Sequence, residues 1–482
     1  MEVTRKKIFS NVFWGFAERI CAQLVSFIVS IIIARILEPE AYGTIALVII
    51  FLDILQIFVD SGLGNALIQK KDADSLDFST VFFTNVVICV ILYIIMFFCA
   101  PLISKFYGNL QLIKIIRVIS VSLIISGVKN VQFSYVSKNL IFKKFFFATI
   151  IGTICAAFVG ILMAYKGFGV WALVAQSLTN TTIDTIILWL TVRWRPKFKF
   201  SVKRLRALYS YGWKILVTAT INSFYNKIRE LLIGKLYSPA ELAYYNRGYS
   251  LSYLIVGNID GAISNVILPS MANEQDDINK IKNLMIKMMT LTSFILLPCL
   301  LGVVAVADNL IEVLLTKKWM FTVPYLRIFC VTFIFYPIFT GNLTVYKAIG
   351  RSDLYLKIEI VKKSIGFILL CSSVKFGAMA IAYSFLVTAV IEIFIDTFPN
   401  YKILGLNVFS QFSYLLKTYL SGVLMGIIVY MIGKMNLNVY IELFIQILAG
   451  IIIYIFFSVI LKNESFFYIF GIIKNKIKKD GK

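Results

Sequence analysis

Long apolar runs, each close to the length of a membrane-spanning helix, constrain this chain more than any other feature. The first run extends from Asn11 to Gly43, contains about twenty apolar residues interrupted by Glu18-Arg19, and closes with the segment Leu37-Glu38-Pro39-Glu40. At ~1.5 Å per residue, such a helix crosses the ~30 Å hydrocarbon core of a bilayer. Proline between two acidic residues then ends the helix, and we expect the chain to turn back there.

The composition agrees with a membrane location. Hydrophobic residues make up 59% of the 482-residue chain and charged residues 15%, and a soluble fold of this size has too little interior for so much apolar surface. The seven cysteines all lie in apolar runs without paired spacing, and there is no histidine. The sequence therefore predicts an all-α polytopic membrane protein without a disulfide framework, metal or cofactor, and nothing in it indicates a nucleic-acid partner.

Apolar periodicity predicts about fourteen membrane helices. They lie near residues 12–36, 42–66, 78–100, 112–136, 145–165, 168–192, 207–234, 241–268, 284–306, 322–346, 354–374, 378–398, 411–433 and 438–461. A basic connector over 193–206 separates the sixth helix from the seventh.

The first twelve helices are interpreted as two related halves. Pro39 follows Trp14 by 25 positions, and Pro239 follows Trp213 by 26, each at the end of a long span that carries charge. We therefore expect an N-terminal six-helix bundle over 1–200 and a pseudo-symmetric second bundle over 201–402. Residues 403–482 would add two transmembrane helices and a basic tail.

The distribution of lysine and arginine predicts the orientation. With the N-terminus inside, 27 of the 48 basic residues fall in inner loops and tails, and nine fall in outer connections. This bias follows the positive-inside rule, so both termini are expected on the cytoplasmic side. The tail after Ser465 combines aromatic residues with lysines, a composition that suits an anionic membrane surface as well as plain solvent.

Twelve basic residues fall in neither group and lie within or near the predicted spans. They are Arg19, Arg117, Lys129, Lys214, Lys227, Arg229, Arg247, Lys287, Arg327, Lys362, Lys363 and Lys417. A charge at the bilayer centre costs at least ~2.5–3.5 kcal/mol, so it normally faces a partner or a wet cavity. Three of them, Lys287, Arg327 and Lys417, are close enough to a boundary to extend toward water.

Helical spacing aligns many polar residues on single faces. In the seventh span Lys214, Thr218, Asn222, Asn226 and Arg229 recur every three or four residues, a polar stripe that favours a cavity over tight packing. Shorter stripes occur in the second span (Asp53, Gln56, Asp60, Gly64), the fourth (Ser122, Ser126, Lys129, Asn130), the sixth (Gln176, Asn180, Asp184) and the eighth (Arg247, Ser250, Gly257, Gly261, Ser264). The first span (Asn11, Gly15, Glu18, Ala22, Ser26) fits tight helix packing equally well.

Several segments together resemble bacterial polysaccharide flippases of the Wzx type. They are Trp14-Gly15, Ala34-Arg35-Ile36-Leu37-Glu38-Pro39-Glu40, Tyr42-Gly43, 60–69 (DSGLGNALIQ), Gly169-Val170-Trp171-Ala172-Leu173 and Tyr244-Tyr245-Asn246-Arg247. The resemblance covers nearly the whole chain, is densest before residue 270, and is strongest toward the branch that exports teichuronic and colanic acid. The wider superfamily includes multidrug and toxin extruders and the lipid II flippase.

The resemblance implies a V-shaped pair of six-helix bundles that alternates between inward and outward openings. The expected cargo is an oligosaccharide repeat unit on undecaprenyl pyrophosphate, moved across the bacterial cytoplasmic membrane, with membrane lipid and a polymerase of the same pathway as partners. In such flippases the first, second, seventh and eighth helices line the central cavity. By position, the substrate-binding candidates are the cations Arg19, Lys214, Arg229 and Arg247, whose guanidinium and ammonium groups suit phosphate oxygens, and the amides Asn222 and Asn226 of the same stripe.

The driving force is expected to be an ion. Without histidine, the candidate coupling groups are carboxylates: Asp53, Asp60, Asp184, Glu392 and Asp396. Glu392 and Asp396 are one turn apart, a spacing that suits a shared proton or cation. For any single acid, the favoured interpretation is that it neutralises a neighbouring cation, as Glu359 would do for Lys362 and Lys363, so the coupling group stays unassigned.

Other classes of membrane protein are also considered. A cation-extruding drug transporter would share the fold but should have an acidic cavity. A lipid-linked glycosyltransferase or polymerase would normally carry a large outer loop with catalytic acids, whereas the longest outer connection here, 307–322, is under twenty residues. A purely structural protein gives no reason for lysines at mid-span. We therefore expect a flippase rather than an enzyme, with an extruder as the alternative.

Overall fold

A computed structural model of the chain describes residues 5–60, 63–435 and 437–480. Over these ranges the regular elements are α-helices and two short 3-10 turns, so the predicted all-α class is confirmed. Contacts divide the chain into two compact units, Met1–Ala243 (unit 1) and Tyr244–Lys482 (unit 2). Each unit is described separately below.

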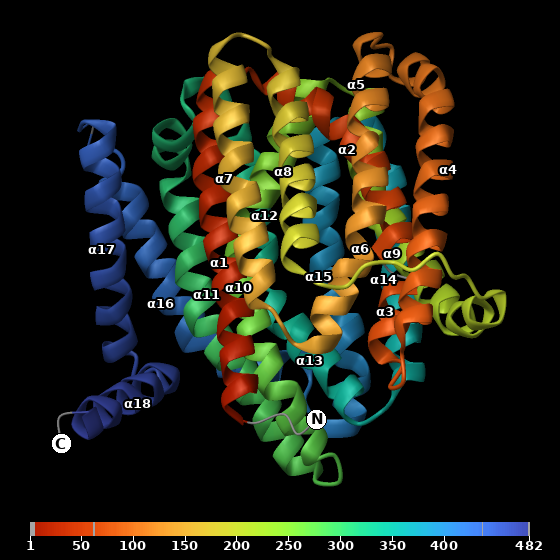
Figure 1. The fold of residues 1–482 in the computed structure, drawn as a ribbon. Helices are drawn as coiled ribbons and strands as arrows, with labels where there is room; N and C mark the ends of the chain where they lie inside the picture. The colour runs from red at the N-terminus through yellow and green to blue at the C-terminus, as the bar shows by residue number, and fades with distance from the viewer. Residues whose placement is uncertain (1–4, 61–62, 436, 481–482) are drawn as a thin grey trace. The chain divides into compact units, whose positions relative to one another are not determined.

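Unit 1 contains nine helices, and the start of a tenth, in the part of the chain that the structure describes (Figure 1). They are α1 (Arg5–Ile36), α2 (Pro39–Asp60), α3 (Leu63–Gln69), α4 (Ser75–Tyr107), α5 (Gln111–Ile119), α6 (Val121–Asn139), α7 (Lys143–Tyr165), α8 (Val170–Thr191), α9 (Val202–Leu236) and the start of α10 (Pro239–Asn273). Helix α7 packs between α1 and α8, α6 packs against α4 and α8, and α9 packs against α2, α3 and α4.

Proline begins two helices at the turns that the sequence predicts. Helix α2 starts at Pro39 and α10 at Pro239, because a helix tolerates proline in its first turn, where the missing N–H has no helical partner. These two turns touch: a Cβ atom added to Gly43 would lie 1.6 Å from the carbonyl oxygen of Pro239. Only glycine lets the two backbones approach this closely.

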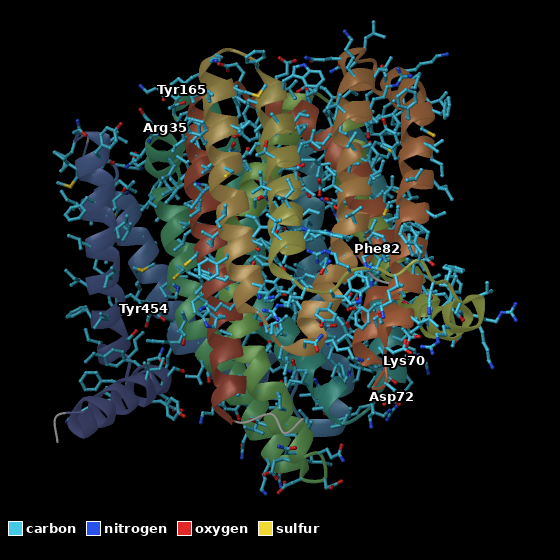
Figure 2. The ribbon with its side chains drawn as sticks, in the orientation of Figure 1. Arg35, Lys70, Asp72, Phe82, Tyr165 and Tyr454 are labelled. Atoms are coloured by element: carbon cyan, nitrogen blue, oxygen red, sulfur yellow. The ribbon has the colours of Figure 1, made fainter. Side chains whose placement is uncertain are left out.

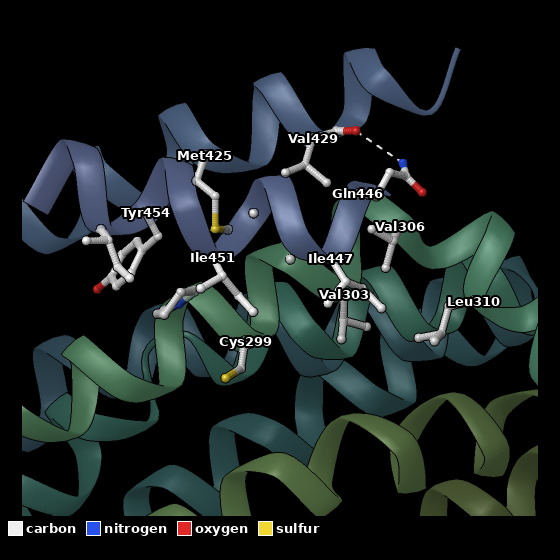
Figure 3. A pocket seen from close by; sticks show the side chains of 14 residues that line it. Cys299, Val303, Val306, Leu310, Met425, Val429, Gln446, Ile447, Ile451 and Tyr454 are labelled. Atoms are coloured by element: carbon white, nitrogen blue, oxygen red, sulfur yellow. Dashed lines mark hydrogen bonds between the residues drawn. The ribbon is translucent and has the colours of Figure 1, made fainter. Parts of the chain in front are cut away.

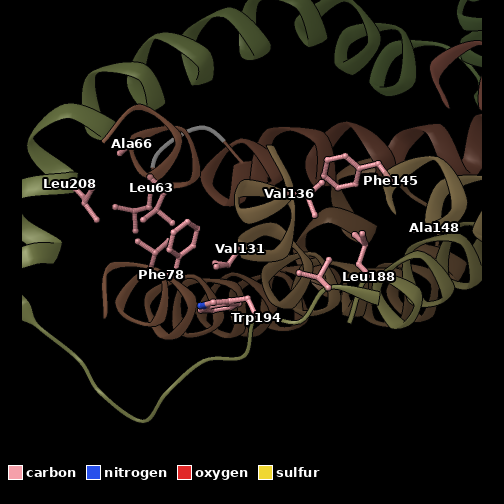
Figure 4. Packing of buried hydrophobic residues seen from close by; sticks show 13 residues of the cluster. Leu63, Ala66, Phe78, Val131, Val136, Phe145, Ala148, Leu188, Trp194 and Leu208 are labelled. Carbon is pink, nitrogen blue, oxygen red and sulfur yellow. The ribbon is translucent and has the colours of Figure 1, made fainter. Parts of the chain in front are cut away.

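A hydrophobic cluster forms part of the core of unit 1 (Figure 4). Phe78 of α4 packs on Trp194 with ring centroids 5.8 Å apart, and Leu208 of α9 belongs to the same cluster. The non-helical connector that follows α8 is fixed here, since the Lys197 N–H donates to Ser79 Oγ at 3.0 Å. The cluster therefore holds the beginning of α9 against α4.

An ionic cluster lies beside this core, at the beginning of α4. Asp74 caps the helix by accepting from the Asp77 N–H, and Arg204 of α9 lies 2.5 Å from the Asp74 carboxylate and 3.2 Å from that of Asp77. Lys70 also contacts the buried Asp77, at 2.7 Å. The hydrogen bond from Arg204, followed by that from the Asp77 N–H, lowers the pKa of Asp74 to about 2. Figure 2 shows Lys70 at the end of unit 1 opposite Arg35.

Unit 2 contains the rest of α10 and the remaining helices. They are α11 (Ile278–Leu315), η1 (Lys317–Trp319), α12 (Thr322–Phe333), α13 (Tyr336–Ala348), α14 (Ser352–Ser373), η2 (Val374–Phe376), α15 (Ala378–Leu404), α16 (Val408–Ile432), α17 (Val439–Ile460) and α18 (Glu464–Asp480). Helix α11 is central, since α12, α13, α16 and α17 all pack on it, while α14 packs on α15.

Polar contacts attach α17, in the C-terminal helix pair, to α11 within unit 2. Asn309 of α11 donates to Glu442 at 2.8 Å and to Gln446 at 2.9 Å, and both acceptors are buried on α17. The Tyr454 hydroxyl donates to the Phe294 carbonyl of α11 at 2.8 Å. Because buried polar groups must find partners, these bonds fix α17 in register on α11.

Within the described residues, ten helices are long and apolar enough to cross a membrane, or eleven if the bent pair α12–α13 is one span. The two members of that pair meet at 41°. The other three predicted spans correspond to α8, α9 and α14, which have 22, 35 and 22 residues and so are long enough. Their polar and charged residues lower their apolar character, and the count of fourteen stays a prediction.

The compact units divide at a different place from the predicted halves. The sequence places the boundary at 200/201, whereas the contacts place it between Ala243 and Tyr244. The reason is α9, which the internal repeat assigns to the second half but which packs on α2, α3 and α4. The division into 1–200, 201–402 and 403–482 as related domains stays a prediction.

Candidate functional site

Each of the three helices that are too polar to pass as spans carries charge within its length. Asp184 lies on α8, Lys227 and Arg229 on α9, and Lys362 on α14. Charged side chains within a membrane bundle are costly unless they meet partners or water. These three helices therefore contribute charged residues to the candidate site.

A polar pocket of about 420 Å³ lies within unit 1, between α2, α3 and α6. Its lining includes the amides of Gln56, Asn65 and Asn130 and the ammonium of Lys129, together with serine hydroxyls. Residues from the polar stripes predicted on the second and fourth spans thus line the same pocket, which we call the hollow of unit 1. Amides and hydroxyls arranged in this way can exchange hydrogen bonds with a sugar, and the ammonium can contact an acidic group.

Lys129 joins this pocket to α8. Its Nζ atom lies 2.9 Å from an Asp184 carboxylate oxygen, and the two side chains are 28% and 15% exposed. Gly152 of α7 lets α8 approach, since a Cβ atom there would lie 3.3 Å from the Asp184 Cβ. The pair is neutral and partly solvated, so it places a cation beside the pocket at a modest desolvation cost.

Helix α9 carries an ion pair at Lys227 in addition to the predicted polar stripe. Lys227 lies 3.0 Å from Asp53 of α2 and 3.1 Å from Glu230. Arg229 is 5% exposed, with its guanidinium carbon 5.5 Å from the centre of the Tyr225 ring. Asn222 on the same helix is half-buried and Asn226 is exposed.

Unit 2 contains a larger ionic cluster, built on α14 and α15. The Lys362 ammonium, 8% exposed, lies 3.0 Å from Asp396, 3.5 Å from Glu392 and 3.6 Å from Glu359. Lys363 contacts Glu359 at 3.7 Å. Asp396 is fully buried, and its main-chain carbonyl accepts from the Tyr346 hydroxyl at 2.5 Å. One lysine thus holds together three carboxylates from two helices.

The other predicted site residues fall in several places. Arg247 of unit 2 has its guanidinium carbon 5.3 Å from the centre of the Trp319 ring, and Arg19 of unit 1 is exposed on α1. The side chains of Lys214 and Asp60 lie outside the described residues. The predicted groups that the structure describes therefore lie in several places along the two units.

Four of the five predicted coupling residues form ion pairs with lysines. Asp53, Asp184, Glu392 and Asp396 each lie within 4 Å of a lysine ammonium. The expected contacts of Glu359 with Lys362 and Lys363 are confirmed. Sequence reasoning named Lys129, Lys227 and Lys362 as deep cations but did not include them among the site residues. The only available signal was that each falls within a predicted span.

These features define a class: a multi-pass helical membrane protein of the fold shared by lipid flippases and multidrug extruders. The fold resembles a solved structure of the lipid II flippase MurJ in an inward closed conformation, with a TM-score of 0.75 and 15% identity over 94% of this chain and 99% of that one. It also resembles an inward-facing multidrug resistance MATE family transporter of the MOP superfamily, with a TM-score of 0.59 and 14% identity over 79% of this chain and 95% of that one.

Sequence comparison identifies the family. Residues 32–324 match the model of a family described as polysaccharide biosynthesis protein, and this chain belongs to that family. It is 23% identical to the teichuronic acid biosynthesis protein TuaB of Bacillus subtilis, over 94% of this chain and 95% of TuaB. It is 22% identical to the lipopolysaccharide biosynthesis protein WzxC of Escherichia coli, over 83% and 82% of the two chains. The resemblance stated from the sequence is confirmed.

Proposed function

We propose that this protein is a flippase rather than an enzyme. It would move an oligosaccharide repeat unit, linked to undecaprenyl pyrophosphate, from the inner to the outer leaflet of a bacterial cytoplasmic membrane. Family membership and the similarity to the biosynthesis proteins TuaB and WzxC support a role in polysaccharide biosynthesis. The observation that carries the proposal is the hollow of unit 1, whose amides, hydroxyls and lysine match the chemistry of a sugar with acidic groups.

The proposed path uses alternating access with both termini in the cytoplasm. Arg19, Lys214, Asn222, Asn226, Arg229 and Arg247 would contact the pyrophosphate and the sugars, since arginine donates a forked pair of hydrogen bonds to phosphate oxygens. The lipid tail would remain in the bilayer, so only the polar head needs a hydrated route. A polymerase of the same pathway would receive the product.

The group that couples transport to an ion is proposed to be one of the carboxylates Asp53, Asp60, Asp184, Glu392 and Asp396. Four of these contact a lysine ammonium, so a proton or cation would have to replace or neutralise part of an ion pair. The Lys362 cluster suits this best because it contains more carboxylates than ammonium groups. The multidrug extruder, the second candidate for this fold, is supported by the fold alone.

The direct test is to delete the gene and identify the lipid-linked sugar that accumulates on the inner leaflet. Complementation with the wild-type gene should clear it. The triple variant Lys214→Gln, Arg229→Gln, Arg247→Gln should reach the membrane at normal levels and fail to clear it. Normal polysaccharide export from that variant would reject the proposed cationic contacts. A deletion strain without any lipid-linked intermediate would reject the flippase itself.

A further inference from the structure

A second polar pocket, of about 580 Å³, lies within unit 2 where α11, α16 and α18 meet. It is separate from the hollow and ion pairs described above. Two lysines line it, Lys287 from α11 and Lys417 from α16, together with Asn283, Tyr468 and one acid, Glu464. These charged groups sum to a net positive charge.

The two ammonium groups are positioned without carboxylate partners. Lys287 lies 4.3 Å from the centre of the Tyr468 ring, and Lys417 donates to the main-chain carbonyl of Lys462 at 3.2 Å. Among the described residues, neither lysine has a carboxylate within ion-pair distance. Both side chains are exposed. An anion in the pocket would therefore meet two lysines whose charge is not already neutralised.

The pocket wall is structurally fixed. Asn463, only 3% exposed, accepts from the Ser465 N–H at 3.0 Å and donates to Thr418 Oγ1 at 2.9 Å. This capping bond starts α18, and the Phe466 ring packs on Phe294 of α11 at 6.3 Å. The beginning of α18 is thus attached to both α16 and α11, so Tyr468 reaches the pocket from a defined position.

Helix α18 has the character of an interfacial helix. Phe467 and Phe470 are 50% and 55% exposed, and Lys474 follows one turn later. Figure 1 shows α18 turning sharply away from the direction of α17. Exposed aromatic side chains followed by lysines are typical of helices that lie in the headgroup region, which places the pocket beside α18 at headgroup depth.

An apolar groove of about 380 Å³ lies farther along α11 and α16, with α17 as its third wall (Figure 3). The pocket uses α11 as far as Leu291, and the groove begins at Pro298, a separation of ~10 Å at helical rise. Met425 of α16 and Ile451 of α17 form its other walls. Gly302 keeps it open, because a Cβ there would meet only the Met425 methyl, at 3.9 Å.

We propose that α11, α16, α17 and α18 bind an anionic glycerophospholipid. Its phosphate would lie between Lys287 and Lys417, and one acyl chain would occupy the groove. Basic pockets between membrane helices at headgroup depth bind anionic lipids, and the groove provides an apolar site that a free phosphate would leave empty. The bound lipid would join α18 to the helix pair, and this site does not depend on the proposed transport function.

The test uses the full-length protein purified in a neutral detergent. Thermal unfolding is followed while phosphatidylglycerol, phosphatidylcholine, undecaprenyl phosphate or inorganic phosphate is added. Phosphatidylglycerol should raise the Tm in a saturable way, because a ligand that binds the folded state stabilises it. Phosphatidylcholine and inorganic phosphate should leave the Tm unchanged. Stronger stabilisation by undecaprenyl phosphate than by phosphatidylglycerol would overturn the proposal in favour of a cargo site.

Matched variants locate the site. Lys287→Gln and Lys417→Gln should each weaken phosphatidylglycerol binding about fivefold, the equivalent of the ~1 kcal/mol that one lysine contributes near an anionic surface. Lys434→Gln is the control, since Lys434 also lies over a tyrosine, 5.0 Å from the centre of the Tyr430 ring, but lines neither pocket nor groove.

Two more variants distinguish a loss of lipid binding from misfolding of the protein. Lys287→Arg keeps the charge and should retain binding, while Gly302→Leu should block the groove and weaken binding with both lysines in place. Equal phosphatidylglycerol affinity in the wild type and in the Lys287→Gln, Lys417→Gln double variant would overturn the proposal. So would an unchanged Tm of the wild type with phosphatidylglycerol.

Discussion

The Lys129–Asp184 pair of unit 1 and the Lys362 cluster of unit 2 each include an acid on the last helix of a predicted half. Asp184 follows Gly169 by fifteen positions, and Glu392 follows Gly377 by fifteen. Each glycine precedes a helix and has a positive φ, 56° and 104° respectively. In both units, therefore, an acid fifteen positions after a positive-φ glycine contacts a lysine from another helix.

The two places differ in charge balance and burial. The unit 1 pair is neutral, and its lysine is 28% exposed beside the polar pocket. In unit 2, Lys362 is 8% exposed and contacts three acids; with Lys363 included, the five groups sum to −1 when all are ionised. Unit 1 thus places the lysine of a neutral ion pair beside a hollow, whereas unit 2 buries an excess of carboxylate. We associate the first with cargo and the second with coupling.

The largest expected effect comes from removing the buried lysine. Lys362→Met should destabilise the protein by about 3–5 kcal/mol, because it leaves the fully buried Asp396 without its counter-charge. Lys129→Met should cost clearly less, since its partner is partly solvated. Thermal unfolding in detergent measures both. Adding Asp396→Asn to Lys362→Met should recover part of the loss, and equal destabilisation by the two lysine variants would remove the contrast.

The second effect concerns coupling. Asp396→Asn should lower gradient-driven transport about tenfold, a rate change equivalent to about 1.4 kcal/mol, while binding of cargo persists. Asp184→Asn should alter cargo binding and leave the dependence on the ion gradient intact. Transport into proteoliposomes with imposed proton or sodium gradients separates the two. A gradient response that is lost in the Asp184 variant but kept in the Asp396 variant would reverse our assignment.

A smaller effect is expected from the pocket lining. Asn65→Leu removes one amide from the hollow and should weaken the apparent affinity for cargo about fivefold, the loss of about 1 kcal/mol for one hydrogen bond. Asn139→Leu is the control, since Asn139 is on α6 but outside the pocket. Export by cells at limiting cargo supply provides the measurement, and equal impairment by both variants would argue against the pocket.

The smallest effect is a pH dependence at the beginning of α4, away from both charged places. The pKa of Asp74, lowered to about 2 by Arg204, lies below its ordinary value of 3.8. Its contribution to stability is therefore present above pH ~4 and is lost as the pH falls toward 2. The stability difference between wild type and Arg204→Gln should shrink over that range. A difference that stays constant down to pH 2 would show that Arg204 acts through packing alone.

The sequence predicted the fold class and the helix turns, because both depend on local patterns. Apolar run length gave the spans, and proline gave the starts of α2 and α10. Polar stripes on the second and fourth spans also predicted sides of the unit 1 pocket. These features need no knowledge of which helices are neighbours.

The partners of the charges could not be predicted in the same way. Lys129 and Asp184 are 55 positions apart, and Lys362 and Asp396 are 34 apart, so their contacts depend on tertiary packing. The i,i+3 contact of Glu359 with Lys362 was predicted because it lies on one helix. The packing of α9 on α2, α3 and α4 was not predicted for the same reason. A sequence repeat indicates that two helices are related, but it does not indicate which helices they contact.

The meeting of the two proline turns has a consequence for sequence variation in the family. Because the Gly43 Cα faces the main chain of Pro239 with no room for a methyl group, the two positions are not free to change independently. A homologue with a larger side chain at the position of Gly43 should carry an altered length or composition in the segment that joins α9 to α10. Paired changes of this kind in a deep alignment would show that the two positions constrain each other.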